Sequence, residues 1–134
     1  MIKEKLDRYI DILDKIPEHQ NKYAWLMLLG KKSQTLVEQL RLKKFEVHGC
    51  QTRTWLVPGY HPPETIHFSA DSDALISKGM VCMLADIFSG STRKNILAFE
   101  RKDLDGLNLD VLLTPGRRNG VHGMLQKIRE YAIE

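Results

Sequence analysis

Two cysteine side chains, Cys50 and Cys82, are the strongest nucleophiles that the sequence offers. A cysteine thiolate attacks sulfur or carbonyl carbon and binds metal ions, so each of these residues needs a chemical or a structural explanation. Two cysteines are too few for a disulfide framework, and their spacing matches no zinc motif. We therefore expect two free thiols, and the question is which of them does chemistry.

Cys50 lies in the segment Val47-His48-Gly49-Cys50-Gln51, at a glycine-containing bend between two strand-like runs. A thiol on a loop can reach a partner's active site, whereas a thiol inside a helix or strand usually packs against its neighbours. His48 and Arg53 would add positive potential that favours the thiolate, the reactive form in sulfur exchange. The alternative interpretation is that a tight turn needs a small residue at this position.

Cys82 lies in Gly79-Met80-Val81-Cys82-Met83, inside the most apolar stretch of the chain. Free cysteine is among the most frequently buried residue types and packs as a small hydrophobic side chain. We therefore expect Cys82 to be buried in a helix and to have no chemical role.

A metal site and a peptidase site are weaker interpretations of the same residues. Ligand types are present at Cys50, Cys82, His48, His61, His67 and Asp73, but no C-x₂-C or H-x₃-H spacing links any pair. The residues around Cys50 do not match the papain-type cysteine motif, and no base with an orienting partner stands out. We expect no metal site in this chain.

Two adjacent arginines, Arg117 and Arg118, stand in the segment Gly116–Gly120, just before the predicted last helix. Guanidinium groups near a helix N-terminus can bind a carboxylate or phosphate, because the helix end adds a partial positive charge. A solvated basic turn is the other interpretation.

The elements that position these residues belong to a chain of 134 residues, a length typical of one domain with a real core. The net charge of +3 is modest and spread along the sequence, which does not indicate a nucleic-acid partner. No apolar stretch reaches the roughly 18 residues of a membrane span, and the first residues lack the apolar core of a signal peptide. These features predict a cytoplasmic protein with no membrane partner.

Apolar residues at three- and four-residue spacing predict an amphipathic helix from Ile2 to Ile16, ended by Pro17. A second helix, expected in the core, should run over residues 18–29 with Gly30 as its cap. The long apolar stretch from Ala74 to Phe88 predicts a central helix, with Asp71-Ser72-Asp73 as cap residues. Further helical segments are predicted at 92–98, with Ser91 or Thr92 as cap, and at 104–113 and 119–133.

Between the second helix and the central helix, the apolar period changes to two. Short alternating or β-branched runs at 45–48, 53–57 and 65–68 predict a three-stranded antiparallel meander packed on one face by the central helix. Cys50 falls in the first connection, and the breakers Pro58, Gly59, Pro62 and Pro63 fall in the second. The sequence thus predicts the α+β class, with residues 1–134 forming a single domain.

Three separated motifs can be compared with a known family. They are Val47-x-Gly49-Cys50-Gln51-Thr52-x-x-Trp55, Ser69-Ala70-Asp71-Ser72-Asp73-Ala74-x-Ile76-x-Lys78-Gly79 and Leu113-Thr114-Pro115-x-Arg117-x-x-Gly120. In order and spacing they resemble the SufE-type sulfur-acceptor proteins, which include the paralogue CsdE, and the resemblance runs from about Tyr23 to the C-terminus. It implies an α+β fold related to that of the iron–sulfur scaffold proteins, the SufE/IscU-like fold.

The resemblance also implies a function, the activation of a pyridoxal-phosphate-dependent cysteine desulfurase of the SufS or CsdA type. Cys50 would accept the desulfurase's persulfide sulfur by transpersulfuration and pass it to an iron–sulfur scaffold or another acceptor. This transfer needs thiolate character, access and a good leaving thiolate. It would need no cofactor in this chain.

The same resemblance assigns supporting residues. The arginine of the third motif falls on Arg117, with Arg118 beside it as the alternative, and would orient the partner or the loop. His48, Gly49 and Gln51 flank the thiol and would shape its loop or contact the partner.

Two other functions stay open at this point. One is a metal-binding scaffold on which a cluster is built, which requires ligands beyond Cys50. The other is a regulatory partner that activates a desulfurase without taking sulfur. Because a persulfide is easily reduced or over-oxidised, we also expect the loop to hold Cys50 against apolar surface until a partner opens it.

Overall fold

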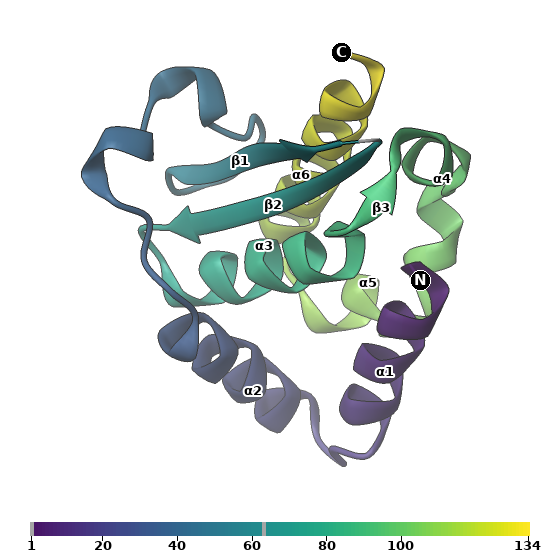
Figure 1. The fold of residues 1–134 in the computed structure, drawn as a ribbon. Coiled ribbons are helices and arrows are strands. Elements are labelled where there is room, and N and C mark those ends of the chain that lie inside the picture. Colours follow the sequence, from purple (N-terminus) through teal and green to yellow (C-terminus); the bar gives the residue numbers. More distant parts are fainter. Residues whose placement is uncertain (1, 63) are drawn as a thin grey trace.

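The computed structural model describes residues 2–62 and 64–134, which form a three-stranded antiparallel sheet with helices packed against one face (Figure 1). The helices and 3₁₀ turns are α1 Ile2–Asp14, α2 His19–Lys32, η1 Glu38–Leu40, η2 Lys43–Phe45, α3 Leu75–Phe88, α4 Arg93–Ala98, η3 Arg101–Leu107, α5 Leu109–Leu112 and α6 Pro115–Ile133. The strands are β1 Thr54–His61, β2 Thr65–Ser72 and β3 Ser91–Thr92, in the order β1-β2-β3. The predicted α+β class and three-stranded antiparallel sheet are confirmed.

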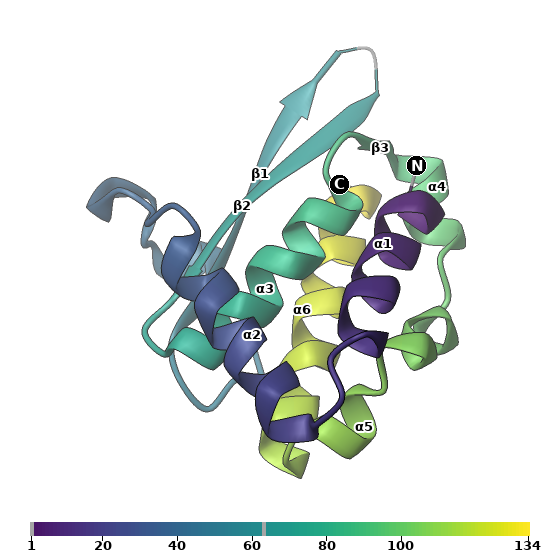
Figure 2. The same cartoon turned by 90° about the horizontal axis from the view of Figure 1, so that it is seen from below.

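The core lies between the sheet and the helices α3 and α6. The central helix α3 is confirmed, and eleven of its residues are buried because its apolar side chains face the sheet on one side and other helices on the other. Along β2, the side chains of Ile66, Phe68 and Ala70 are buried while those between them are exposed, so this part of the strand has one solvent face. The helices α1 and α2 pack on α3 from the side away from the sheet (Figures 1 and 2).

The first predicted helix is observed as α1, but the predicted end of the second helix was wrong. The helix α2 continues through Gly30 to Lys32; it buries Leu26 in the core and packs further apolar side chains against it, namely Tyr23, Trp25, Met27 and Leu29. Gly30 is inside the helix because α2 crosses α3 there: a side chain on Gly30 would lie 2.5 Å from the carbonyl oxygen of Leu75. On α3, Gly79 makes the reciprocal approach, since a side chain there would collide with the carbonyl of Leu26.

The predicted strand over residues 45–48 was wrong. Phe45 ends the turn η2, and Glu46 makes only an isolated bridge to Trp55. The chain touches the sheet there through one further hydrogen bond, from the Val47 amide to the Thr54 carbonyl at 2.8 Å. The third strand is instead β3, which pairs antiparallel with the start of β2.

Two of the predicted breakers, Pro58 and Gly59, lie within β1, which pairs with β2 from Thr54 to His61. Pro58 is tolerated because β1 is an edge strand and needs no amide hydrogen on its open side. β1 ends at His61 and β2 begins at Thr65, and the predicted breaker Pro63 lies outside the described residues.

The residues Asp71-Ser72-Asp73 do not cap α3 as predicted. Asp71 and Ser72 end the strand β2, and the N-cap of α3 is Ala74, which makes no side-chain cap. The Thr92 cap of α4 is confirmed, because its hydroxyl accepts the Asn95 amide at 3.1 Å.

The last helix starts earlier than the predicted residue 119. Thr114 is the N-cap of α6 and accepts the Arg117 amide, and Pro115 occupies the first turn, where a missing amide hydrogen costs nothing. The segment Gly116–Gly120 is therefore the start of a helix and not a solvated turn. Within the described part of the chain, no helix combines the length and apolar character needed to cross a bilayer.

Candidate functional site

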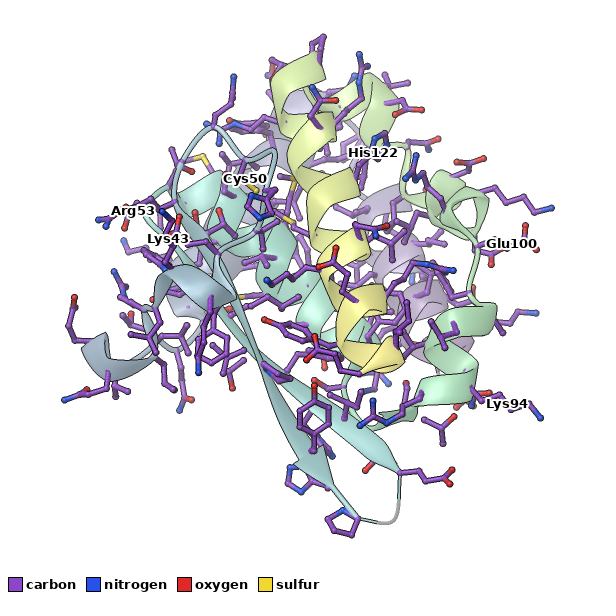
Figure 3. The ribbon with its side chains drawn as sticks, turned by 90° about the horizontal axis from the view of Figure 1, so that it is seen from above. Lys43, Cys50, Arg53, Lys94, Glu100 and His122 are labelled. Carbon is purple, nitrogen blue, oxygen red and sulfur yellow. The ribbon has the colours of Figure 1, made fainter. Side chains whose placement is uncertain are left out.

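Cys50 sits in a short connection, His48–Gln51, that leads from the Glu46 bridge into β1; we call it the cysteine loop. Gly49 has φ of +91°, a backbone conformation that favours glycine, and this fixes the bend just before the thiol. The Cys50 side chain is half-buried, whereas those of His48 and Gln51 are exposed. The loop lies beside the N-terminal half of α6 (Figure 3).

Three glycines of α6 make room for the cysteine loop. They are Gly116, Gly120 and Gly123, spaced so that they share one side of the helix. A side chain on Gly120 would lie 3.2 Å from the Cys50 sulfur, one on Gly123 would collide with the His48 carbonyl, and one on Gly116 with the Gln51 side-chain amide. We call these three positions the glycine face of α6. The loop rests directly on helix backbone because no side chain intervenes.

Burial and polar neighbours act in opposite directions on the pKa of the Cys50 thiol. Its Sγ atom lies 3.8 Å from the carbonyl oxygen of Gly120, to which it donates a weak hydrogen bond. Burial raises the pKa of the Cys50 thiol, and hydrogen bonding with Thr54 and the positive charge of Arg117 offset only part of that effect. The site therefore partly covers the Cys50 thiol, while Thr54 and Arg117 act in the direction that favours its anion.

Arg117 reaches the site through a buried serine. Its Nη1 atom donates a 2.6 Å hydrogen bond to the hydroxyl of Ser77, which lies in the first turn of α3 and is 2% exposed. Ser77 also accepts from Thr52, at 3.4 Å. The Ser72 hydroxyl lies 3.4 Å from that of Thr52 and 3.0 Å from that of Thr54. These four residues, Thr52, Thr54, Ser72 and Ser77, form a hydroxyl cluster that links Arg117 to the strand after the cysteine loop.

The structure separates the two candidate arginines. Arg117 faces the hydroxyl cluster, whereas the Arg118 guanidinium donates to the carbonyl of Asp110 at 2.7 Å, on another side of α6. Arg53, which the sequence suggested as a source of positive potential, pairs with Asp73 at 3.0 Å. The charge that acts on Cys50 comes from Arg117.

A buried carboxylate anchors the segment before the cysteine loop. Asp71 is 1% exposed and accepts the Leu36 amide at 2.9 Å, the Ser72 amide at 2.8 Å and the Arg41 guanidinium, while Lys78 lies at 3.5 Å. Although burial raises the pKa of Asp71, these hydrogen bonds and the Lys78 charge together hold it below its usual range. Asp71 thereby fixes the chain between α2 and η2 to the end of β2.

Sequence reasoning missed the hydroxyl cluster and the glycine face. Ser77 gave no signal, because a lone serine in an apolar helix carries no pattern. The spacing of Gly116, Gly120 and Gly123 could have indicated a close approach to α6, if residues 115–119 had been recognised as helical.

Cys82 is less buried than predicted. It is half-buried and lines a surface pocket of about 350 Å³ together with Phe68, Ala70 and Asp86. Its Sγ lies 3.7 Å from the Ala70 carbonyl, and burial raises the pKa of its thiol. Cys82 is on α3, outside the hydroxyl cluster around Cys50.

Metal-ligand side chains do not converge in the part of the chain that the structure describes. Within residues 2–62 and 64–134, no three histidine, cysteine or carboxylate side chains are grouped so that they could hold a metal ion. The six ligand-type residues noted in the sequence are thus dispersed. Among them the rings of His61 and His67 meet edge to face, with ring centroids 4.3 Å apart.

The sequence and the fold were compared with known proteins. Residues 7–132 match the SufE family, described as an Fe-S metabolism associated domain. An uncharacterized SufE-like protein of Rhizobium meliloti is 30% identical over 131 residues, which cover 95% of this chain and 94% of that protein. The chloroplastic/mitochondrial SufE-like protein 1 of Arabidopsis thaliana is 28% identical over 129 residues, 96% of this chain but only 35% of that longer protein.

The fold also resembles that of a solved structure. A hypothetical protein of Thermus thermophilus, solved in solution, superposes with a TM-score of 0.75 at 18% identity, over 96% of this chain and 93% of its own. The family match spans nearly the whole chain and includes the cysteine loop, the hydroxyl cluster and the glycine face. The chain belongs to the SufE family of domains associated with iron–sulfur metabolism.

Proposed function

We propose that residues 1–134 form a single sulfur-acceptor domain, in which Cys50 takes persulfide sulfur from a pyridoxal-phosphate-dependent cysteine desulfurase. The observation that carries the proposal is the placement of a half-buried thiol on a glycine-bent loop that rests on α6, the helix whose Arg117 charge lowers the pKa of that thiol. A structural cysteine would need neither the bend nor the charge. Membership of the SufE family supports the same interpretation.

The transfer is a displacement at sulfur that needs no oxidant. Cys50 loses its proton to solvent, and its thiolate attacks the terminal sulfur of the desulfurase persulfide. The new sulfur–sulfur bond forms as the old one breaks, and the bonding electron pair leaves with the desulfurase thiolate, which takes up a proton. The products are a desulfurase thiol and a Cys50 persulfide, so removal of sulfur frees the desulfurase for another turnover.

The residues around Cys50 have separate parts in this proposal. The Arg117 guanidinium stabilises the thiolate before attack and the persulfide anion after it. His48, Gly49 and Gln51 shape the loop, and Gly49 supplies the bend that lets it leave the glycine face. The cover that α6 gives to the side chain of Cys50 would protect the Cys50 persulfide between donor and acceptor.

The sulfur would then pass to an iron–sulfur scaffold or another acceptor by the same chemistry. The chain's own part in this reaction uses a thiol and a guanidinium, without a cofactor. Two unpaired thiols suit a reducing compartment, and we propose that the protein acts in the cytoplasm.

Desulfurase activation tests the proposal against the regulatory alternative. Purified desulfurases of the SufS and CsdA types are assayed for alanine release from cysteine, with the wild-type protein, Cys50→Ser and Cys82→Ser. We expect the wild type and Cys82→Ser to accelerate turnover of one enzyme and Cys50→Ser to have no effect. Equal acceleration by Cys50→Ser would show that the protein regulates the desulfurase without taking sulfur. Stoichiometric iron or zinc in the purified protein would instead favour a metal-binding scaffold.

A further inference from the structure

We infer that the surface around Cys50 is a basic docking face for a protein partner whose sulfur-donating site is rimmed by acidic side chains. The inference deepens the proposed function, on which it rests, by stating the chemistry of the partner's surface. We define the basic face by Lys43, Lys44, Arg53, Arg117 and Lys127.

Two segments that are far apart in the sequence build this face. Residues 41–53 lead into and through the cysteine loop, and residues 115–127 form the first turns of α6. They meet at the glycine face, and the Lys127 ammonium donates a 2.9 Å hydrogen bond to the Lys44 carbonyl. Figure 3 shows Lys43 and Arg53 on the same side of the molecule as Cys50, with Lys94 and Glu100 at the opposite side.

Folding concentrates charge that the sequence spreads out. The two segments hold seven of the lysines and arginines and one acidic residue, Glu46, a net charge of +6. Because the whole chain carries +3, all other residues together carry −3. Arg118 points to another side of α6, and Arg41 and Arg53 pair with Asp71 and Asp73; leaving Arg118 out and counting these two carboxylates gives a net charge of +3 around the thiol. This equals the net charge of the whole chain, so the excess positive charge is concentrated around Cys50.

The surroundings of the basic face favour a protein over a nucleic acid or a lipid headgroup. The segment between α2 and β1, with η1 and η2, projects from the body of the molecule next to the sheet (Figures 1 and 2). It exposes 59% of Val37 and 42% of Leu42, the latter immediately before Lys43. Apolar side chains beside basic ones match the mixed surface of a protein interface, whereas a phosphate backbone offers only charge.

This arrangement serves the transfer itself. The sulfur donor presents an anionic persulfide, and a partner with an acidic rim would be steered onto the end of the molecule that carries the acceptor. Steering by exposed charges acts on the association rate and weakens as salt shortens the screening length, from about 30 Å at 0.01 M to about 8 Å at 0.15 M.

The test measures association of the full-length Cys50→Ser protein, which binds without transferring sulfur, with purified desulfurases of the SufS and CsdA types. Lys43→Glu is compared with Lys94→Glu, which makes the same charge change at an exposed lysine on the opposite side, and with Lys43→Arg, which keeps the charge. We expect Lys43→Glu to slow association about three- to tenfold at low salt, and much less at about 0.3 M salt. Lys94→Glu and Lys43→Arg should stay near the parent rate, and circular dichroism verifies that each variant folds.

Equal effects of Lys43→Glu and Lys94→Glu, or association that does not depend on salt, would overturn the inference. A DNA duplex of about 20 base pairs and phosphatidylserine vesicles serve as alternative ligands. If Lys43→Glu weakens binding to either of them but does not slow association with a desulfurase, the inference is also overturned. Sulfur loading of Cys50 with salt-independent association would remove the docking inference alone. Salt-dependent, Lys43-dependent association with a desulfurase that never loads Cys50 would support docking and refute sulfur acceptance.

Discussion

The Arg117 guanidinium donates a 2.6 Å hydrogen bond to the hydroxyl of Ser77, so a residue of α3 fixes the cation that acts on the Cys50 thiol in the cysteine loop. Ser77 is 2% exposed, which means that this bond is shielded from water and holds Arg117 in one orientation. Three elements, α3, α6 and the cysteine loop, are thereby tied into one site.

The first prediction concerns this hydrogen bond. Ser77→Ala should release the Arg117 guanidinium, and because the cation lowers the pKa of Cys50, its withdrawal should raise that pKa further. At any pH below the pKa the thiolate fraction falls, so alkylation by iodoacetamide should be slower and its pH profile should move to higher pH. The measurement uses a Cys82→Ser background so that only Cys50 reacts.

Two variants serve as controls for this prediction. Ser77→Thr keeps the hydroxyl and should retain the parent pH profile, whereas Arg117→Ala should shift it in the same direction as Ser77→Ala. If Ser77→Ala and Arg117→Ala both left the profile unchanged, Arg117 would not tune Cys50.

The second prediction concerns the glycine face. In Gly123→Ala the added methyl group would collide with the His48 carbonyl, so the cysteine loop must move off α6. We expect faster alkylation of Cys50 and a loss of about 1–3 kcal/mol in the free energy of unfolding. Alanine stabilises a helix by about 1 kcal/mol relative to glycine. A net loss of unfolding free energy would therefore show that the loop contact outweighs this helix preference.

Gly59→Ala is the matched control, because the added methyl group there meets nothing closer than 3.6 Å. It should leave the alkylation rate unchanged. Unchanged alkylation in Gly123→Ala as well would mean that the loop does not rest on this face in solution.

The third prediction concerns the buried carboxylate of Asp71. Removing its charge leaves Lys78 buried beside a neutral group, and breaking a buried ion pair typically costs about 3 kcal/mol or more. Asp71→Asn should therefore lower the free energy of unfolding by about that amount near pH 7, as measured by urea denaturation.

The pH dependence follows from the lowered pKa of Asp71 in the folded protein. A depressed carboxyl pKa adds stability at pH values above the pKa of the unfolded chain, and this contribution is lost as pH falls through the folded pKa. The difference between wild type and Asp71→Asn should shrink in acid, below about pH 4. A difference that stays constant down to about pH 2 would argue against a charged Asp71.

Local patterns in the sequence were enough for much of the fold. The three- and four-residue apolar spacing located α1, the long apolar stretch from Ala74 to Phe88 located α3, and the position of Cys50 at a glycine bend followed from Gly49. These features depend on residues close together in the chain, which is why spacing alone could predict them.

The features that were missed depend on contacts between distant residues. Gly30 resembles a helix cap by position, but its role comes from Gly79, 49 residues later, where α2 and α3 cross. The strand predicted at 45–48 is only a bridge because the turn η2 occupies the chain up to Phe45. The strand β3 was missed because its two residues are too few to show an alternating pattern. The hydrogen bond between Ser77 and Arg117 was also missed, because it joins residues 40 positions apart on two different helices.

The most direct test of sulfur acceptance is mass spectrometry of the Cys50 peptide after incubation with cysteine and the desulfurase that the protein activates. Before digestion, thiols and persulfides are blocked with an alkylating reagent, and Cys50→Ser and Cys82→Ser are treated in parallel. We predict a mass increase of one sulfur atom on the peptide that contains Cys50, in the wild type and in Cys82→Ser. An added sulfur on Cys82 in the Cys50→Ser protein, or none on Cys50 in the wild type while cysteine turnover is accelerated, would contradict it.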